Sequence, residues 1–112
     1  MTVIQDITQD LTIPIRQVIY SKTGDSERYV RDTIFNDSAV WNIPAGTTGV
    51  VYATDEKGVH SSNNNVTFEN NVILAQLPVI NNRGIASAEI ELTCNGVAVA
   101  TFDFVIMVGQ SA

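Results

Sequence analysis

Apolar and polar residues alternate most clearly in the last quarter of the chain. Apolar side chains occupy every second position from Ala86 to Cys94, and again from Phe102 to Val108. A period of two is typical of half-buried β-strands, and the intervening Asn95-Gly96 pair is typical of a tight turn. The pattern predicts a β-hairpin whose apolar face forms the centre of the core.

The same positions predict the register of this hairpin. A two-residue Asn95-Gly96 loop with regular pairing would place Ile90 opposite Thr101, which turns the phenylalanines to the wrong face. We therefore predict a three-residue loop over residues 95–97, or an equivalent bulge, so that Ile90 faces Phe102.

The rest of the chain consists of shorter β-like runs separated by turn residues. Strands are expected over residues 17–21, 29–35, 40–43, 50–54, 66–68 and 72–74. The polar run from Ser61 to Asn65 is expected to form a mobile surface loop, and a short helical turn around residues 75–80 is left open. Turn signals at this spacing predict an all-β fold, an antiparallel β-sandwich of about eight short strands.

The chain length fits a single sandwich domain over residues 1–112. Residues 1–13 are expected to form an edge strand or an extended arm, because Pro14 cannot donate a hydrogen bond within a sheet. About a third of the residues are Val, Ile or Thr, whose branched side chains favour strands. Composition therefore supports the all-β prediction.

Two groups of apolar residues are singled out. The expected core determinants are Trp41, Ile90, Leu92, Phe102 and Phe104. The candidate protein interface comprises Val3, Ile4, Ile7, Val105 and Met107. Val105 and Met107 suggest an interface because they occupy the second face of the last strand, where a solitary sandwich usually carries polar groups. Either the N-terminal arm or a neighbouring subunit is expected to cover them.

Charge and composition exclude several functions. The net charge is −6 and no cluster of Lys and Arg occurs, which argues against nucleic acid as a partner. No segment approaches the ~20 apolar residues of a membrane span. Cys94 and His60 are the single cysteine and histidine, so neither a structural zinc site nor a His-based catalytic set is expected. No cofactor and no enzymatic activity are predicted.

A carbohydrate-binding module is an alternative of a different class. Trp41 would then stack on a sugar together with Tyr20, Tyr29 and Tyr52, which requires an exposed aromatic platform. The apolar neighbours of Trp41 favour a packing role instead.

The order of several short motifs resembles the N-terminal domain of the baseplate upper proteins of phages that infect Gram-positive bacteria. These motifs are Asp10–Pro14, Arg16–Tyr20, Thr23–Asp25, Trp41–Gly46, Asp55–Gly58, and Ile90–Leu92 followed by Thr101–Phe104. The resemblance covers nearly the whole chain, although each motif alone is weak.

The resemblance implies a structural role in the virion. Such a module docks on the tail baseplate beside the distal tail protein and supports a receptor-binding protein or fibre for host attachment. It implies a multi-copy homo-oligomer, with a trimer as one option. Because the family usually continues into fibrous sequence, three contexts stay open: a piece of a longer protein, a phage whose receptor-binding parts are separate chains, and a head fibre or capsid decoration that contacts the capsid protein.

Overall fold

The computed structural model describes residues 2–13 and 15–110, so Pro14 and the ends of the expected 1–112 domain lie outside the described residues. These residues form an all-β sandwich of ten strands, which confirms the fold class. The strands are β1 (Val3–Asp10), β2 (Gln17–Lys22), β3 (Arg28–Asn36), β4 (Ala39–Val40), β5 (Thr47–Thr54), β6 (His60–Asn63), β7 (Val66–Glu69), β8 (Val72–Gln76), β9 (Gly84–Cys94) and β10 (Val97–Gly109).

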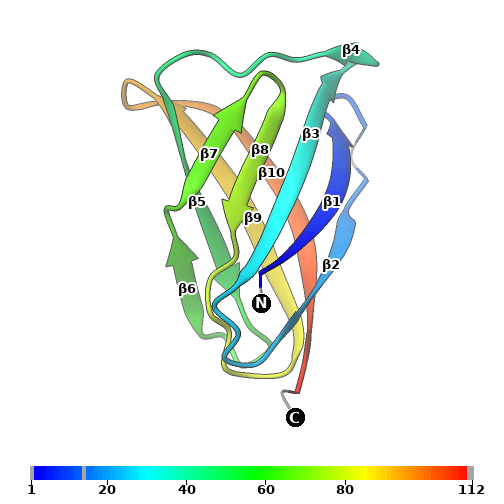
Figure 1. Ribbon diagram of the computed structural model, residues 1–112, viewed down its shortest axis with the longest axis vertical. Coiled ribbons are helices and arrows are strands. Elements are labelled where there is room, and N and C mark those ends of the chain that lie inside the picture. The colour runs from blue at the N-terminus through cyan, green and yellow to red at the C-terminus, as the bar shows by residue number, and fades with distance from the viewer. Residues whose placement is uncertain (1, 14, 111–112) are drawn as a thin grey trace.

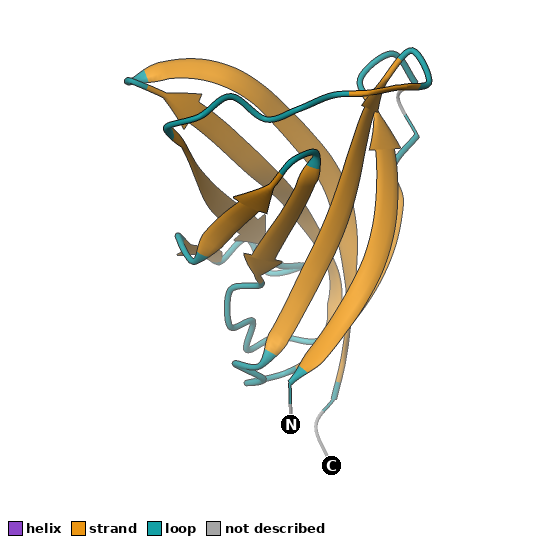
Figure 2. Ribbon diagram, turned by 45° about the horizontal axis from the view of Figure 1, so that its top comes forward, coloured by secondary structure: helices purple, strands orange, loops and turns teal. Residues whose placement is uncertain are grey.

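The strands form two sheets that pack face to face (Figures 1 and 2). The first sheet has the order β1-β3-β8-β7, with the short β4 paired to β3. The second sheet has the order β2-β10-β9-β5-β6. The N-terminal strand β1 is therefore an edge strand, which is one of the two arrangements expected for it.

The antiparallel pairing expected for the sandwich holds for six of the eight strand pairs among the described residues, but both sheets are mixed. β1 pairs parallel with β3, and β2 pairs parallel with β10. The chain passes from the first sheet to the second after β1 and returns after β2, reversing direction each time. β1 and β3 therefore run the same way when they meet in one sheet. Short connections between sheets can thus produce parallel pairs without a long crossover helix.

The β9–β10 hairpin has the predicted register through the bulge rather than the longer loop. Asn95 and Gly96 both have positive φ, 52° and 78°, as a two-residue type I′ turn requires. One extra residue, Val99, then shifts the pairing between Ala98 and Ala100. As a result Ile90 pairs with Phe102, which confirms the predicted register.

The core lies between the two sheets and is dominated by this hairpin. Every second residue of β9 and β10 points inward, where it meets the inward residues of β3, β5 and β8. The largest fully buried apolar side chains include Phe104, Ile19, Ile34, Ile73, Leu77, Ile90, Leu92 and Ile106. Small Ala86 and Ala88 share the inward face of β9 and leave room for the bulky side chains of neighbouring strands.

Two local expectations were wrong, and the structure also answers the question of a helical turn that was left open. Residues His60–Asn63 form the edge strand β6 rather than a loop, because backbone pairing with β5 stabilises a strand even where the side chains are polar. The strand expected over residues 40–43 is reduced to Ala39–Val40. The described residues contain no helix, and the segment 77–80 follows β8 as an irregular chain.

Glutamine side chains connect the two sheets along the edge formed by β1 and β2. The amide group of Gln5 accepts from the N–H of Tyr20 at 2.8 Å and donates to the carbonyl of the same residue. Gln17 donates to the carbonyl of Thr8 at 3.1 Å. A primary amide has the donor and acceptor of a peptide group. These side chains therefore take the place of a backbone ladder between strands that belong to different sheets.

One carboxyl group is buried in the core. Asp32 lies on β3 between Val30 and Ile34, is fully buried, and has no hydrogen-bond partner for either carboxyl oxygen. Because burial disfavours the charged form, the pKa of Asp32 rises to about 8. The side chain is therefore mostly protonated at neutral pH.

We predict that Asp32→Asn changes the pH dependence of stability. The unfolded carboxyl ionises above its ordinary pKa of 3.8, whereas the folded one stays protonated up to about 8. The wild-type protein therefore loses up to about 1.4 kcal/mol of folding free energy per pH unit inside this window, and no more above it. Asn cannot ionise, so its stability relative to wild type should rise from pH 4 to 8 in urea unfolding. A difference that is constant with pH would contradict the prediction.

We also predict that Gln5→Ala loosens the edge of the second sheet. Loss of two hydrogen bonds should lower the free energy of unfolding by about 1–2 kcal/mol. Amide hydrogen exchange of Tyr20 should become faster, because its N–H loses its partner. Thr8→Ala is the matched control, since the exposed side chain is removed while the carbonyl that accepts from Gln17 remains. Unchanged exchange at Tyr20 would show that the Gln5 amide does not hold the two edges together.

Candidate functional site

The outer face of the second sheet carries a group of exposed apolar side chains. Val18 and Tyr20 on β2 pair with Val105 and Met107 on β10, and Met107 also pairs with Ile85 on β9. Strand alternation directs all five outward, and we call them the outer patch. Tyr20 is 61% exposed, Ile85 52%, Val18 48% and Met107 37%. An apolar group of this size on a sheet face is typical of a surface that binds another protein.

The candidate interface residues do not form one surface. Val105 and Met107 belong to the outer patch, whereas the residues of β1 lie on the other sheet. Ile4 is exposed on the outer face of the first sheet beside Tyr29, Val3 is half-buried, and Ile7 is part of the core. The described part of β1 therefore does not cover the outer patch.

The candidate core residues lie where a sandwich places its packing groups. Ile90, Leu92, Phe102 and Phe104 are buried between the sheets. Trp41 is half-buried and meets the ring of Phe102 edge to face, with ring centroids 6.4 Å apart. This geometry uses the indole ring for packing at the open end of the core.

The four aromatic residues considered for sugar binding are not brought together. Tyr20 and Tyr52 lie on the outer face of the second sheet, but on β2 and β5, with β10 and β9 between them. Tyr29 is on the first sheet. Together with the packing of Trp41, this arrangement provides no shared aromatic platform.

Charged residues border the outer patch at both ends. Glu89 on β9 pairs with Asp103 on β10, four residues beyond Ile85 and Met107. Arg16 and Tyr52 line the same shallow hollow of about 200 Å³. At the opposite end, Lys22 ends β2, and Arg83 immediately precedes β9. Arg28–Asp25 and Arg31–Asp6 are ion pairs on the first-sheet side of the molecule, and Arg83 donates to the side-chain oxygen of Gln110 at 3.5 Å.

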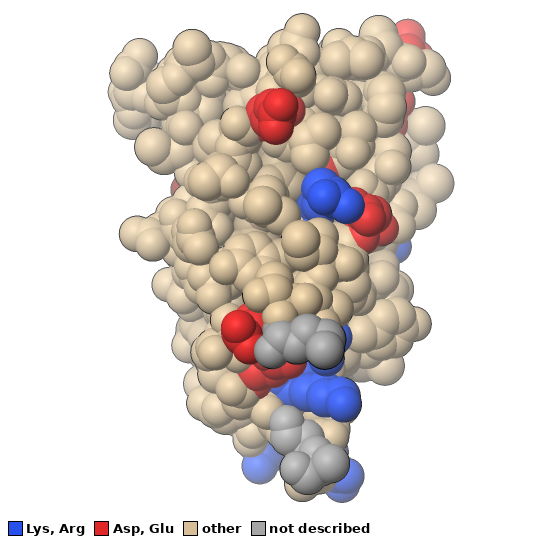
Figure 3. All heavy atoms as spheres, viewed as in Figure 1, with Lys and Arg blue, Asp and Glu red and all other residues tan. Residues whose placement is uncertain are grey.

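Lys and Arg gather at one end of the molecule. Figure 3, which views the first sheet, shows most of these side chains toward the end where β2 finishes and β3 begins. The acidic residues Glu89, Glu91 and Asp103 lie away from that end, on the second sheet. The protein therefore carries its excess negative charge unevenly.

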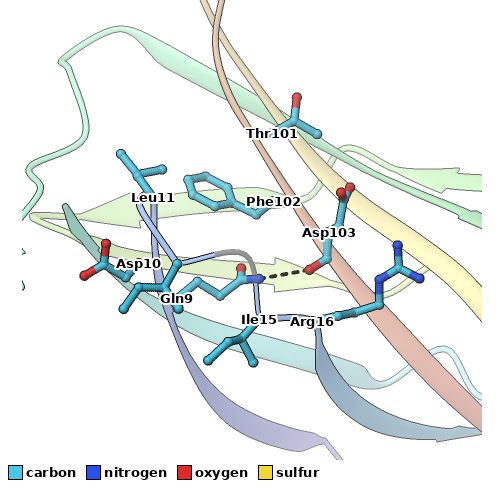
Figure 4. Close-up of a pocket in the computed structure, with 9 residues that line it drawn as sticks. Gln9, Asp10, Leu11, Ile15, Arg16, Thr101, Phe102 and Asp103 are labelled. Carbon is cyan, nitrogen blue, oxygen red and sulfur yellow. Dashed lines mark hydrogen bonds between the residues drawn. The ribbon is translucent and has the colours of Figure 1, made fainter. Parts of the chain in front are cut away.

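A groove of about 360 Å³ lies where the chain crosses between the sheets (Figure 4). Leu11 of the crossing segment stands beside Phe102, Ile15 also lines the groove, and Gln9 donates to the carbonyl of Asp103 at 2.9 Å. The groove contains no nucleophile, base and orienting group in contact, which acid–base or covalent catalysis would need.

Asp10 holds the crossing segment in place. Its carboxylate accepts hydrogen bonds from the N–H and hydroxyl of Thr12 and from the N–H groups of Asp37 and Ser38. The hydrogen bonds of Thr12, and after them those of the two backbone N–H groups, lower the pKa of Asp10 to about 2. Asp37 and Ser38 both have positive φ, so Asp10 also stabilises the tight β3–β4 turn.

Neither a metal site nor a membrane span is evident in the part of the chain that the structure describes. No group of three or more His, Cys, Asp and Glu side chains in residues 2–13 and 15–110 could hold a metal ion. Within the same ranges, no helix is long and apolar enough to cross a membrane.

Comparison with known proteins identifies the fold. No protein-family model and no curated protein matches the sequence. Among solved structures, the chain is similar to the N-terminal domain of phage TP901-1 ORF48, a baseplate upper protein, with a TM-score of 0.71 and 16% sequence identity. The match covers 97% of this chain and 99% of that one. The chain therefore has the fold of a phage baseplate upper protein N-terminal domain, as the ordered motifs predicted.

Proposed function

We propose that this protein is a structural component of a phage virion, a module that docks on the tail baseplate and supports receptor-binding or fibre parts for host attachment. The observation that carries the proposal is the match of the entire sandwich to a baseplate domain. Fold alone does not determine function, so the surface must also fit the role. The outer patch fits it, because an exposed apolar sheet face is what a docking module presents to its neighbours.

The proposed role is attachment and architecture rather than catalysis. Its partners are other phage structural proteins, namely the distal tail protein or a receptor-binding protein. A head fibre or capsid decoration that contacts the capsid protein would use the same module in another place. The two locations differ in the part of the particle that carries the chain, and particle imaging separates them.

We predict that the chain is present on virions at the tail tip. Particles purified from the lysate of the source culture should carry it in mass spectrometry, and immunogold labelling with an antibody to the domain should mark the end of the tail. The matched control is labelling with pre-immune serum. Gold on the head would overturn the baseplate location, and particles without the chain would overturn the virion role itself.

We further predict that cell-wall polysaccharide leaves the fluorescence of Trp41 unchanged. The indole ring is half-buried and packs against Phe102, and Tyr20, Tyr29 and Tyr52 do not join it in an aromatic platform for a sugar. Emission spectra are recorded while polysaccharide from the host wall is added, and denaturant serves as the control that red-shifts the emission. A saturable shift or quenching on addition of polysaccharide would instead indicate a carbohydrate-binding module.

A further inference from the structure

The charges at the ends of the outer patch give this face a polarity. Arg83 and Lys22 lie at one end, and Glu89 and Asp103 lie at the other. Between them are the five apolar side chains of the outer patch. We propose that this face is a two-fold symmetric interface through which two copies of this chain pack sheet against sheet.

Two-fold symmetry determines which residues of the two copies meet across the interface. The two-fold axis lies in the interface, perpendicular to the strands, and reverses the strand direction of the second copy. Each residue therefore faces the residue of the same strand that lies equally far from the axis on the opposite side. Arg83, which immediately precedes β9 and whose guanidinium donates to the side-chain oxygen of Gln110 at 3.5 Å, then faces Glu89 of the other copy. On β10, Met107 faces Val105. On β2, Tyr20 faces Val18. The register of the sheet thus brings Arg83 near Glu89 and apolar groups together at the centre, while on β2 Lys22 lies opposite Arg16, next to Asp103.

The sizes of the opposed side chains also suit close packing. In the two central rows, a large residue meets a smaller one: Met107 meets Val105, Tyr20 meets Val18, and Ile85 meets Ser87. Alternation of large and small side chains lets two layers interdigitate. Gly109 has no side chain and lies opposite Asp103, which leaves space for Lys22 of the neighbouring strand to approach that carboxylate.

Two further charged residues, Arg16 and Glu56, lie near this face. Arg16 immediately precedes β2 and lies opposite Lys22 of the other copy, but it shares the hollow with Asp103 and Glu89, so the acidic end has one positive and two negative groups. Glu56 lies against Gly84 on the side that Gly84 shares with the buried Ala86, and is therefore not part of the outer face. With Arg16 and Glu56 taken into account, one end of the face is still more negative than the other.

A second copy is the occupant that this pattern favours. No described segment of the chain covers the outer patch: Val18, Tyr20, Ile85 and Met107 remain 37% to 61% exposed, and Val105 is half-buried. A net charge of −6 opposes random self-association. The face nevertheless carries Arg83 at one end and the Glu89–Asp103 pair at the other, so reversing the second copy brings these opposite charges together. A different partner would need the same order of charges, whereas a second copy has it by symmetry.

The dimer should be weak and sensitive to salt. A stable interface buries about 800 Å² on each partner, more than five partly exposed side chains supply, so the charged ends must also take part. Exposed ion pairs are screened by salt. Dissociation constants in the micromolar range are therefore expected, increasing with ionic strength.

Sedimentation equilibrium of the full chain at about 10–200 µM tests the association. We expect a reversible dimer of twice the 12.1 kDa chain mass. Met107→Lys places a charge at the centre and should weaken the dimer at least about tenfold. The matched control is Ile4→Lys, an exposed apolar residue of the other sheet, which should dimerise as the wild type does. Tyr20→Lys replaces Met107→Lys if circular dichroism shows that the latter is unfolded.

Charge reversal tests the two-fold arrangement. Arg83→Glu and Glu89→Arg should each weaken the dimer about tenfold, and the double variant should restore it, because each altered residue then meets an opposite charge again. Lys57→Glu, at the same end of the molecule but in the β5–β6 loop, should have no effect.

Three results would overturn the inference: a monomer at the highest concentration, a trimer, or association that neither the lysine substitution nor the charge reversals alter. This test uses the isolated chain and does not depend on the virion role. A dimer absent from particles would reject the proposed function alone, and a monomer found at the tail tip would reject the dimer alone.

Discussion

The bulge at Val99 is the constraint on which the rest of this sandwich depends. The hairpin needs Asn95-Gly96 to turn within two residues, and the core needs Phe102 and Phe104 to face inward. In a regular ladder, the two requirements call for pairing registers that differ by one residue. The extra residue at the bulge supplies this shift, so both requirements are met. The same shift directs Val105 and Met107 outward. The position of the core and the existence of the outer patch are therefore two consequences of one register.

The sandwich joins its sheets along the β1–β2 edge with side-chain amides rather than with backbone pairs. Gln5, Gln9 and Gln17 each reach a backbone group of a strand in the opposite sheet. Such bonds satisfy edge groups that would otherwise be available to other chains. With this edge occupied, the outer faces of the sheets become the larger surfaces on which the module can meet its neighbours.

Much of the fold could be predicted from periodicity and turn residues. The β9–β10 register followed from alternation alone, because a shift of one residue would have exposed two phenylalanines. The strand at His60–Asn63 could not be found this way, since its side chains are polar and its stability comes from pairing with β5. The burial of Asp32 was equally hidden, because alternation along β3 shows two faces of mixed chemistry without showing which one is covered.

The all-β class, the central hairpin and the outward position of Val105 and Met107 could be read from the order of residues alone. These features depend on local patterns and on composition. The packing of the strands was needed to show that the sheets are mixed, that β1 lies away from Val105 and Met107, and that Val18, Tyr20 and Ile85 join them in one patch. Which strands become neighbours depends on how the two sheets bury their apolar faces together, and alternation within a single strand carries no information about that choice.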